Sequence, residues 1–141
     1  MRTPAVVVEA NHQSQLELRK RGPLVSIRIG RDTRSLSIVS ALVDTGASSS
    51  FISRQLAREL RLLRVSIHGR FVHDMEGKHE VEDYEAELMI GDLGIPSPRV
   101  FWGFHRFDSF FQVILGRDIL ANLNMVYEGP VGRVRLDRPK V

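Results

Sequence analysis

The sequence predicts an all-β protein with one or two short helices. Residues Leu24–Gly30 alternate apolar and polar side chains with a period of two, which is typical of a strand with one buried face. Short apolar runs follow one another along the chain, separated by clusters rich in Gly, Pro, Asp and Ser. Helical patterns are confined to two short segments, Arg54–Arg61 and Ile119–Leu123.

The first half of the chain places a tight loop between two strands and a helix. Residues 1–22 have a mixed composition, and we expect an extended arm or an edge strand there. Arg31–Arg34 is a turn, and a second strand at Leu36–Val43 leads into a loop of small residues. Ser53 is the expected N-cap of the helix at Arg54–Arg61, because its hydroxyl can accept a bond from the first turn.

The second half of the chain predicts hairpins. Leu63–Phe71 is expected to be extended, and Val72–Val81 is expected to fold back around the turn Met75-Glu76-Gly77-Lys78, with Gly77 supplying a positive φ. Glu80–Ile90 alternates charged and apolar residues, as a long exposed strand would. Further strands are expected at Val100–Trp102, Gln112–Leu115, Met125–Tyr127 and Val131–Leu136, the last two as a closing hairpin.

Length and composition favour one soluble globular domain. The chain has 141 residues, of which 43% are hydrophobic and 26% are charged. We expect a domain over residues 23–141, preceded by residues 1–22 as an N-terminal arm or a removable pro-segment. The absence of Cys excludes a disulfide framework, a thiolate nucleophile and a zinc–thiolate site.

The net charge of +3 does not indicate a nucleic-acid partner. The basic residues are scattered, and aromatic residues do not interleave with them. The sequence has no apolar run long enough for a signal peptide or a transmembrane helix. We therefore expect no membrane partner and a cytoplasmic location.

Two short motifs carry the chemistry. An apolar run ends on Asp44, which is followed by Thr45, Gly46 and Ala47. The second motif is Ile-Leu-Gly-Arg-Asp-Ile-Leu at Ile114–Leu120, whose glycine lies 72 residues (116 − 44) beyond the aspartate. With the Gly-containing hairpin between them, the two motifs resemble those of the retroviral-type aspartic proteases, the retropepsin-like proteins. The resemblance covers roughly residues 24–127.

This resemblance implies a closed barrel of short strands and a set of site residues. Asp44 would be catalytic together with Thr45 and Gly46, and Thr45 would hydrogen-bond across the axis of a symmetric homodimer. The hairpin around Gly77 would be a flap that closes over a peptide or protein substrate. The implied substrate-binding residues are Ala47, Ser48, Met75, Glu76, Gly77 and Ile114, and the implied structural supports are Gly116 and Arg117.

The chain departs from the viral pattern at Ser48. Many retroviral enzymes have a carboxylate at this position, which forms an ion pair with the arginine that corresponds to Arg117. The flap is also more charged than the glycine-rich flap of the viral enzymes. The sequence leaves open what braces Arg117.

The chemistry needs two carboxyl groups and neither cofactor nor metal. When two carboxyl groups lie close together they cannot both ionise, so they share one proton. The aspartate pair of the aspartic proteases is the standard example of such coupled groups. One group then takes a proton from water while the other donates to the substrate carbonyl. Because the Asp-Thr-Gly motif occurs once, the second Asp44 would have to come from a homodimer partner.

Other interpretations are also open. The same fold could serve as a dimerisation or peptide-binding module that does not hydrolyse, although such a module would not need the Asp44 carboxylate. Asp44 could be only a turn residue at a strand end, and Asp118 is expected to be a local cap. A strand that ends in Asp-x-Gly-x-x-Ser also resembles the phosphate loops of actin-like ATPases, but those folds need two such lobes and a far longer chain. The five His residues lack the spacing of a helical metal-binding motif.

Overall fold

The computed structural model of this 141-residue chain describes residues 6–9, 13–65, 70–74, 77–95, 99–104 and 110–139. Within these ranges, the backbone alone is described for residues 6–9, 70–74 and 79–80. Met75 and Glu76, which were expected at the tip of the flap, lie outside the described residues.

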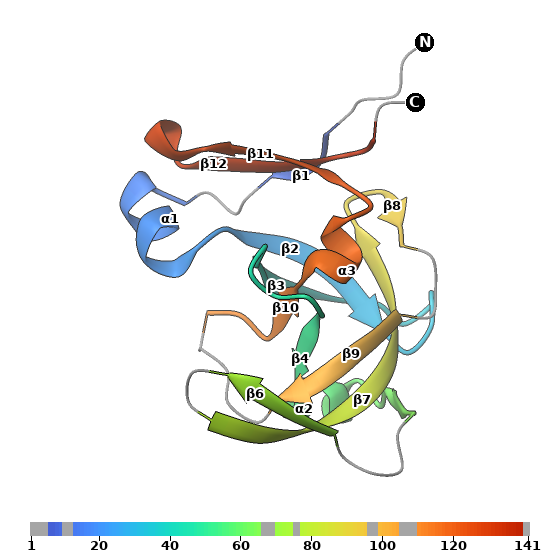
Figure 1. Ribbon diagram of the computed structural model, residues 1–141. Helices are drawn as coiled ribbons and strands as arrows, with labels where there is room; N and C mark the ends of the chain where they lie inside the picture. Colours follow the sequence, from blue (N-terminus) through green and yellow to red (C-terminus); the bar gives the residue numbers. More distant parts are fainter. Residues whose placement is uncertain are drawn as a thin grey trace.

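Six strands close into a barrel, which confirms the predicted all-β fold. Around the barrel the order is β2-β3-β10-β4-β9-β7, and β7 pairs with β2 to close it (Figure 1). Two neighbouring pairs, β3 with β10 and β4 with β9, are parallel. The barrel strands are β2 (Leu24–Gly30), β3 (Ser37–Val43), β4 (Phe51–Ser53), β7 (Gly77–Ile90), β9 (Arg99–Phe104) and β10 (Val113–Leu115).

Three short strands extend β7 beyond the barrel. β5 (Leu63–Arg64) and β8 (Leu93–Gly94) each add two residues to its edges. β6 (Arg70–Asp74) pairs antiparallel with the first half of β7, so that Asp74 lies opposite Gly77. This is the predicted hairpin, and Gly77 has the expected positive φ, at 119°.

The strand β7 is more buried than its sequence pattern indicates. Val81, Glu82, Asp83 and Tyr84 are all buried, so both faces of the strand are covered at this point. The expectation of a long exposed strand is therefore wrong for these residues. β9 covers this stretch of β7 along one edge, with Tyr84 opposite Phe101.

The helices are short and lie outside the barrel. α2 (Arg54–Glu59) is the predicted helix, and the Ser53 hydroxyl accepts from the Leu56 N–H as its N-cap. α3 (Arg117–Leu120) begins two residues earlier than expected. α1 (Gln15–Arg21) was not predicted, so the expectation of an extended arm is wrong at these residues.

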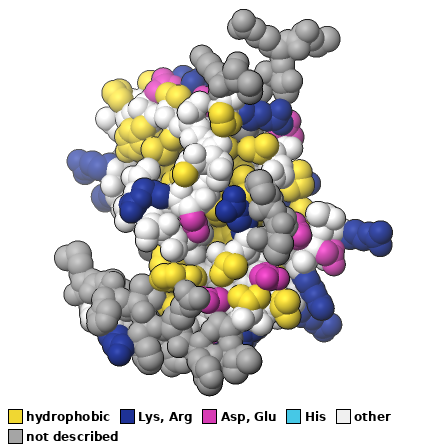
Figure 2. Space-filling model, turned by 45° about the vertical axis from the view of Figure 1, so that its right-hand side comes forward, with side chains coloured by type: hydrophobic (Ala, Val, Ile, Leu, Met, Phe, Trp, Pro, Cys, Tyr) yellow, Lys and Arg dark blue, Asp and Glu magenta, His cyan; other side chains and the backbone are white. Residues whose placement is uncertain are grey.

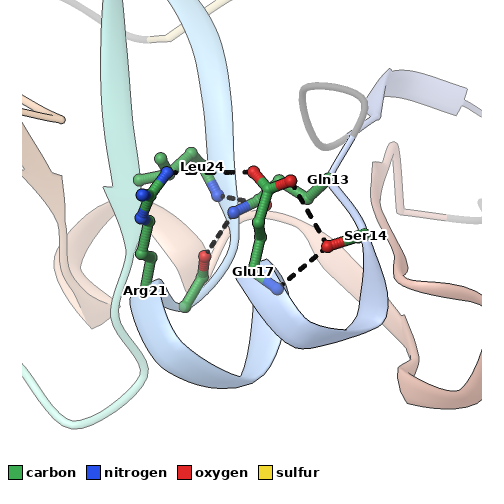
Figure 3. A network of polar contacts seen from close by, with 6 residues as sticks. Gln13, Ser14, Glu17, Arg21 and Leu24 are labelled. Carbon is green, nitrogen blue, oxygen red and sulfur yellow. Dashed lines mark hydrogen bonds and ion pairs between the residues drawn. The ribbon is translucent and has the colours of Figure 1, made fainter.

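The helix α1 is fastened to the start of β2 by one side chain. The Gln13 amide donates to the Gly22 carbonyl and accepts from the Leu24 N–H, each over 2.9 Å. Ser14 caps the helix by accepting from the Glu17 N–H, and Glu17 lies 3.8 Å from the guanidinium of Arg21 (Figure 3). These contacts set the direction in which the chain enters the barrel.

A second, three-stranded sheet brings the two ends of the chain together. Its order is β1 (Val6–Glu9), β12 (Arg133–Asp137) and β11 (Asn124–Glu128). The last two strands form the predicted closing hairpin through the 3₁₀ turn η1 (Gly129–Val131). In Figure 1 this terminal sheet lies at the top, above the barrel and α1.

Candidate active site

Asp44 lies on the loop that joins β3 to β4, at one end of the parallel pair of β3 and β10. Its N–H donates to the Leu115 carbonyl over 3.0 Å, which ties the loop to β10. The Asp44 Oδ1 accepts from the Gly46 N–H over 2.9 Å, and its carbonyl accepts from the Ala47 N–H over 3.2 Å. The half-buried carboxylate is therefore held by a tight turn beside the exposed Thr45 and Gly46.

The second sequence motif packs directly against this loop. The Arg117 N–H donates to the Ala47 carbonyl over 2.8 Å. The Arg117 guanidinium donates to the Thr45 carbonyl over 2.7 Å, although no carboxylate stands at Ser48. The Thr45 carbonyl of the Asp44 loop thus accepts from Arg117 in place of the missing carboxylate. This contact answers the question of what braces Arg117, which the sequence left open.

Gly116 fits a space that admits no side chain. A Cβ at this position would lie 2.3 Å from the Ser49 carbonyl oxygen and 2.9 Å from that of Ala47. The close approach allows its N–H to donate to the Ser50 hydroxyl over 2.9 Å. The parallel register of β3 and β10, with Val43 opposite Leu115, brings the two motifs together across 72 residues (116 − 44).

Sequence reasoning missed the role of Ser50. This side chain is fully buried, and its hydroxyl donates to Asp118 Oδ1 over 2.6 Å. The Ser50 N–H donates to Asp118 Oδ2 over 3.1 Å, so one carboxylate binds both groups of the serine. Asp118 also accepts from the Ile119 N–H, which is the local bond expected from its place in the motif.

Removing the Asp118 carboxylate is expected to loosen the Asp44 loop. Asp118→Ala leaves the buried Ser50 N–H and hydroxyl without their acceptor, which costs about 1–3 kcal/mol of the free energy of unfolding. Asp92→Ala is the control, because Asp92 is 71% exposed and makes a surface ion pair with Arg138 that is worth at most about 1 kcal/mol. Urea unfolding of both variants measures the difference, and equal losses would contradict the prediction.

An ion cluster lies at the base of the β6–β7 hairpin. The Arg54 guanidinium of α2 donates to Glu82 of β7 over 2.9 Å, and Arg64 of β5 lies 3.5 Å from the same carboxylate oxygen. The Tyr84 hydroxyl donates to the other oxygen of Glu82 in a short bond. The bond from Tyr84, supported by the two arginines, lowers the pKa of Glu82 even though burial acts against it.

This cluster makes a part of the stability depend on pH. A carboxyl group whose pKa is lowered by folding stabilises the folded protein at any pH above the pKa that the group has in the unfolded chain. This stabilisation is lost as the pH falls through the lowered pKa of the folded state. We expect Glu82→Gln to lower the free energy of unfolding by about 1–2 kcal/mol at pH 7. The difference in this free energy between the variant and the wild type should narrow below pH 4.5, the ordinary pKa of a glutamate side chain.

Urea unfolding between pH 3 and 7 measures that gap. Tyr84→Phe is a second variant: it keeps the Glu82 carboxylate but removes the hydroxyl that lowers its pKa, so the acid-dependent loss of stability should be smaller than in the wild type and complete at a higher pH. A gap between wild type and Glu82→Gln that is the same at pH 3 and pH 7 would show that the cluster does not act in this way.

The structure brings together most of the implied site residues that it describes. Asp44, Gly46, Ala47, Gly116 and Arg117 are joined by the bonds given above. Ile114 is half-buried on β10, opposite Leu42 of β3 and Phe51 of β4, and Ser48 is exposed on the loop. Gly77 lies on the separate β6–β7 hairpin.

Aromatic side chains flank this region. Phe51 makes edge-to-face contacts with Trp102 and Phe104, with 5.6 Å between ring centroids in each pair. The Arg21 guanidinium at the end of α1 lies 3.6 Å from the centroid of the Phe110 ring. Phe110 lies 44% exposed just before β10.

Among the residues that the structure describes, no group of three or more His, Asp or Glu side chains is arranged to hold a metal ion. No helix in the same ranges is long and apolar enough to cross a membrane.

Comparison with known proteins identifies the family. The family model described as "Aspartyl protease" matches residues 25–119, which is two thirds of the chain and includes the first motif and all of the second except its last residue. The chain belongs to this family, and its barrel is that of the retropepsin-like aspartic proteases. No curated protein matches the chain significantly.

A solved structure of a retroviral protease shows the same fold, and two further structures are more distantly similar. The EIAV protease in complex with the inhibitor HBY-793 is 22% identical, with a TM-score of 0.56, over 70% of this chain and 85% of that one. The retroviral protease-like domain of Ddi1 from Leishmania major is 19% identical, with a TM-score of 0.44, over 73% and 79% of the two chains. The simian foamy virus protease is 10% identical, with a TM-score of 0.46, over 68% and 91%.

Proposed function

We propose that the protein is an aspartic endopeptidase that is active as a homodimer. The observation that carries this proposal is the geometry of Asp44 within a family of aspartyl proteases. Its carboxylate is held in a turn by Gly46, and that turn is bonded to Leu115 and Arg117 of the second motif. A single chain supplies one such carboxylate, so the active site is completed by the Asp44 of a second copy.

The two carboxyl groups share one proton and divide the work of hydrolysis. The ionised Asp44 accepts a proton from water, whose oxygen attacks the peptide carbonyl carbon, while the protonated partner donates to the carbonyl oxygen. The tetrahedral intermediate then collapses and the C–N bond breaks. The leaving nitrogen takes up the proton that Asp44 accepted from water, and the partner takes back a proton from a hydroxyl of the intermediate, so that the pair again shares one proton. Neither a covalent intermediate nor a metal is needed for this sequence.

The neighbouring residues position the substrate. Gly46 is exposed and lets the substrate backbone approach the carboxylates, since a side chain there would stand in its way. Ala47 and Ser48 bond to the substrate main chain, Ile114 lines a pocket for an apolar side chain, and Thr45 bonds to the partner loop. The hairpin of β6 and β7 covers the bound peptide, and Met75, Glu76 and Gly77 contribute to substrate binding.

A digest of mixed peptides tests this function. The wild type is incubated with a diverse peptide mixture between about pH 4 and pH 7, beside Asp44→Asn, and the products are identified by mass spectrometry. Cleavage that requires Asp44 supports the proposal, and the cut sites give the preferences of the pockets. Absence of cleavage by a wild type shown to be dimeric would favour a peptide-binding module instead.

A further inference from the structure

A pocket lies where two strands share one edge of β7. β2 pairs with β7 as far as Gly30, which lies opposite Glu87, and β5 begins at Leu63, which lies opposite Glu85. Because β9 occupies the other edge of β7 at Glu85 and Ala86, β2 and β5 lie along the same edge. They leave a notch at Ala86, and the resulting pocket has a volume of about 260 Å³. β7 lies at the lower right of Figure 1.

Two carboxylates give the pocket its charge. The lining residues are Arg31, Leu63, Glu85, Ala86 and Glu87. Glu85 and Glu87 are half-buried, and they point to the same face of β7 because side chains two residues apart in a strand share a face. Within the part of the chain that the structure describes, neither carboxylate forms an ion pair. With one arginine against two glutamates, the pocket has an excess of one negative charge and attracts a cation.

Exposed apolar side chains flank the pocket on the outer face of the sheet. Leu63 of β5 is 58% exposed, Val65 two residues further is 41% exposed, and Val100 of β9 is 43% exposed. Residues opposite each other on antiparallel strands point to the same face, so Leu63, Glu85 and Val100 form one row across three strands. Figure 2, in which the right-hand side of Figure 1 comes forward, shows hydrophobic and acidic side chains next to each other in the lower half of the molecule.

We propose that this face is a docking site for the substrate protein, and that the pocket takes a lysine or arginine side chain that is flanked by apolar residues. The inference deepens the proposed function, on which it rests, because it names a feature of the substrate away from the bond that is cut. The same strand, β7, supplies the hairpin over the active site at its beginning and the pocket further along.

The chemistry of the pocket fits a long basic side chain. The aliphatic stem of lysine or arginine packs on apolar surface such as Leu63, while the charged end reaches the carboxylates of Glu85 and Glu87. A volume of about 260 Å³ lies just below the range of about 300–1,000 Å³ that is typical of pockets for whole small molecules. The pocket is therefore of a size for one side chain, and the exposed Leu63, Val65 and Val100 cover the residues beside it.

Binding of a short basic peptide tests the pocket directly. The full chain with Asp44→Asn, which should not cleave, is titrated with acetyl-Leu-Arg-Leu-amide and followed by NMR of the backbone amides. The matched peptide has citrulline, which has a similar shape and no charge, in place of arginine. We expect the amide signals of Leu63, Glu85 and Glu87 to shift, and the citrulline peptide to bind at least about fivefold more weakly. Equal binding of the two peptides, or no shift at these residues, would overturn the proposal.

Variants of the two carboxylates give a second test. With Glu85→Gln and Glu87→Gln together, the arginine peptide should bind no better than the citrulline peptide. The control is Glu59→Gln with Asp92→Asn, which changes the net charge equally at two exposed positions outside the pocket. Its affinity for the arginine peptide should stay within about twofold of the starting value. An equal loss in both double variants would mean that only the overall charge matters.

Cleavage of an intact protein shows whether the pocket serves the substrate. A contact made equally with the substrate and with the transition state acts on KM and leaves kcat unchanged. For a protein that the wild type cleaves and that carries basic residues away from the cut, Glu85→Gln with Glu87→Gln should raise KM at least about threefold. An unchanged KM would contradict a docking role.

These experiments separate the pocket from the proposed activity. If the wild type cleaves peptides through Asp44 but the arginine peptide does not shift the signals of the pocket, the docking site is wrong and the proposed function stands. If the arginine peptide binds at the pocket but the wild type hydrolyses no peptide, the site for a basic side chain stands and the endopeptidase activity is wrong.

Discussion

Asp44→Asn is expected to abolish peptide cleavage and to leave the fold intact. Asn keeps an oxygen that accepts from the Gly46 N–H, so the turn that holds the side chain is preserved. The change removes only the ability to take up and release a proton. General acid–base catalysis contributes about 10²–10⁴-fold, so kcat should fall by at least that factor.

The unfolding free energy serves as the control for this variant. It should stay within about 0.5 kcal/mol of the wild-type value, as is usual for a substitution that preserves its contacts. A large loss of stability would mean that the carboxylate itself holds the loop, and the loss of activity would then not identify a catalytic group.

Mixing the two proteins shows whether two carboxylates act together. If wild-type and Asp44→Asn subunits exchange and pair at random in equal amounts, only about one quarter of the dimers retain both carboxylates. Activity should therefore fall below the share of wild-type subunits. Activity that follows this share in direct proportion would contradict a site shared between two copies.

Gly116→Ala is expected to have the largest effect on stability. A Cβ at this buried position would lie 2.3 Å from the Ser49 oxygen, and that atom belongs to the backbone and cannot turn aside. To make room, the Asp44 loop must move away from β10, which weakens the bonds of Gly116 to Ser50 and of Arg117 to Ala47. We expect a loss of about 3 kcal/mol or more, out of a typical total of 5–15 kcal/mol.

Gly94→Ala is the matched control for this substitution. Gly94 is an exposed residue of β8, where a Cβ would meet no atom within 4 Å. Its thermal unfolding midpoint should stay close to that of the wild type, whereas Gly116→Ala should unfold roughly 10 °C lower. If both variants unfold at the same temperature, the close packing of the two motifs does not limit stability.

The sequence predicted the parts of the fold that local patterns determine. The alternation at Leu24–Gly30 and the apolar run at Val113–Leu115 are barrel strands, and Ser53 caps a helix as expected. The helix α1 escaped prediction, although Ser14 and Glu17 have the spacing of a helix start and the bond between them is present. A helix of seven residues is too short for a clear apolar period.

The parts that were missed depend on contacts between distant residues. Nothing near Ser50 in the sequence indicates that it binds Asp118, which is 68 residues away. The burial of Glu82 and Asp83 comes from packing on both sides of β7, so their charge made this strand appear exposed. The two motifs were recognised as a pair by family resemblance, and the parallel register of β3 and β10 supplies the physical reason for their pairing.

The pairing of β1 with β12 has a topological consequence. Val6 lies opposite Asp137, so the first and last described strands leave the molecule side by side (Figure 1). A short linker can therefore join the two ends into a ring without crossing the barrel. A new opening in the exposed turn at Asp32–Ser35 would then give a circular permutant in which every strand keeps its neighbours.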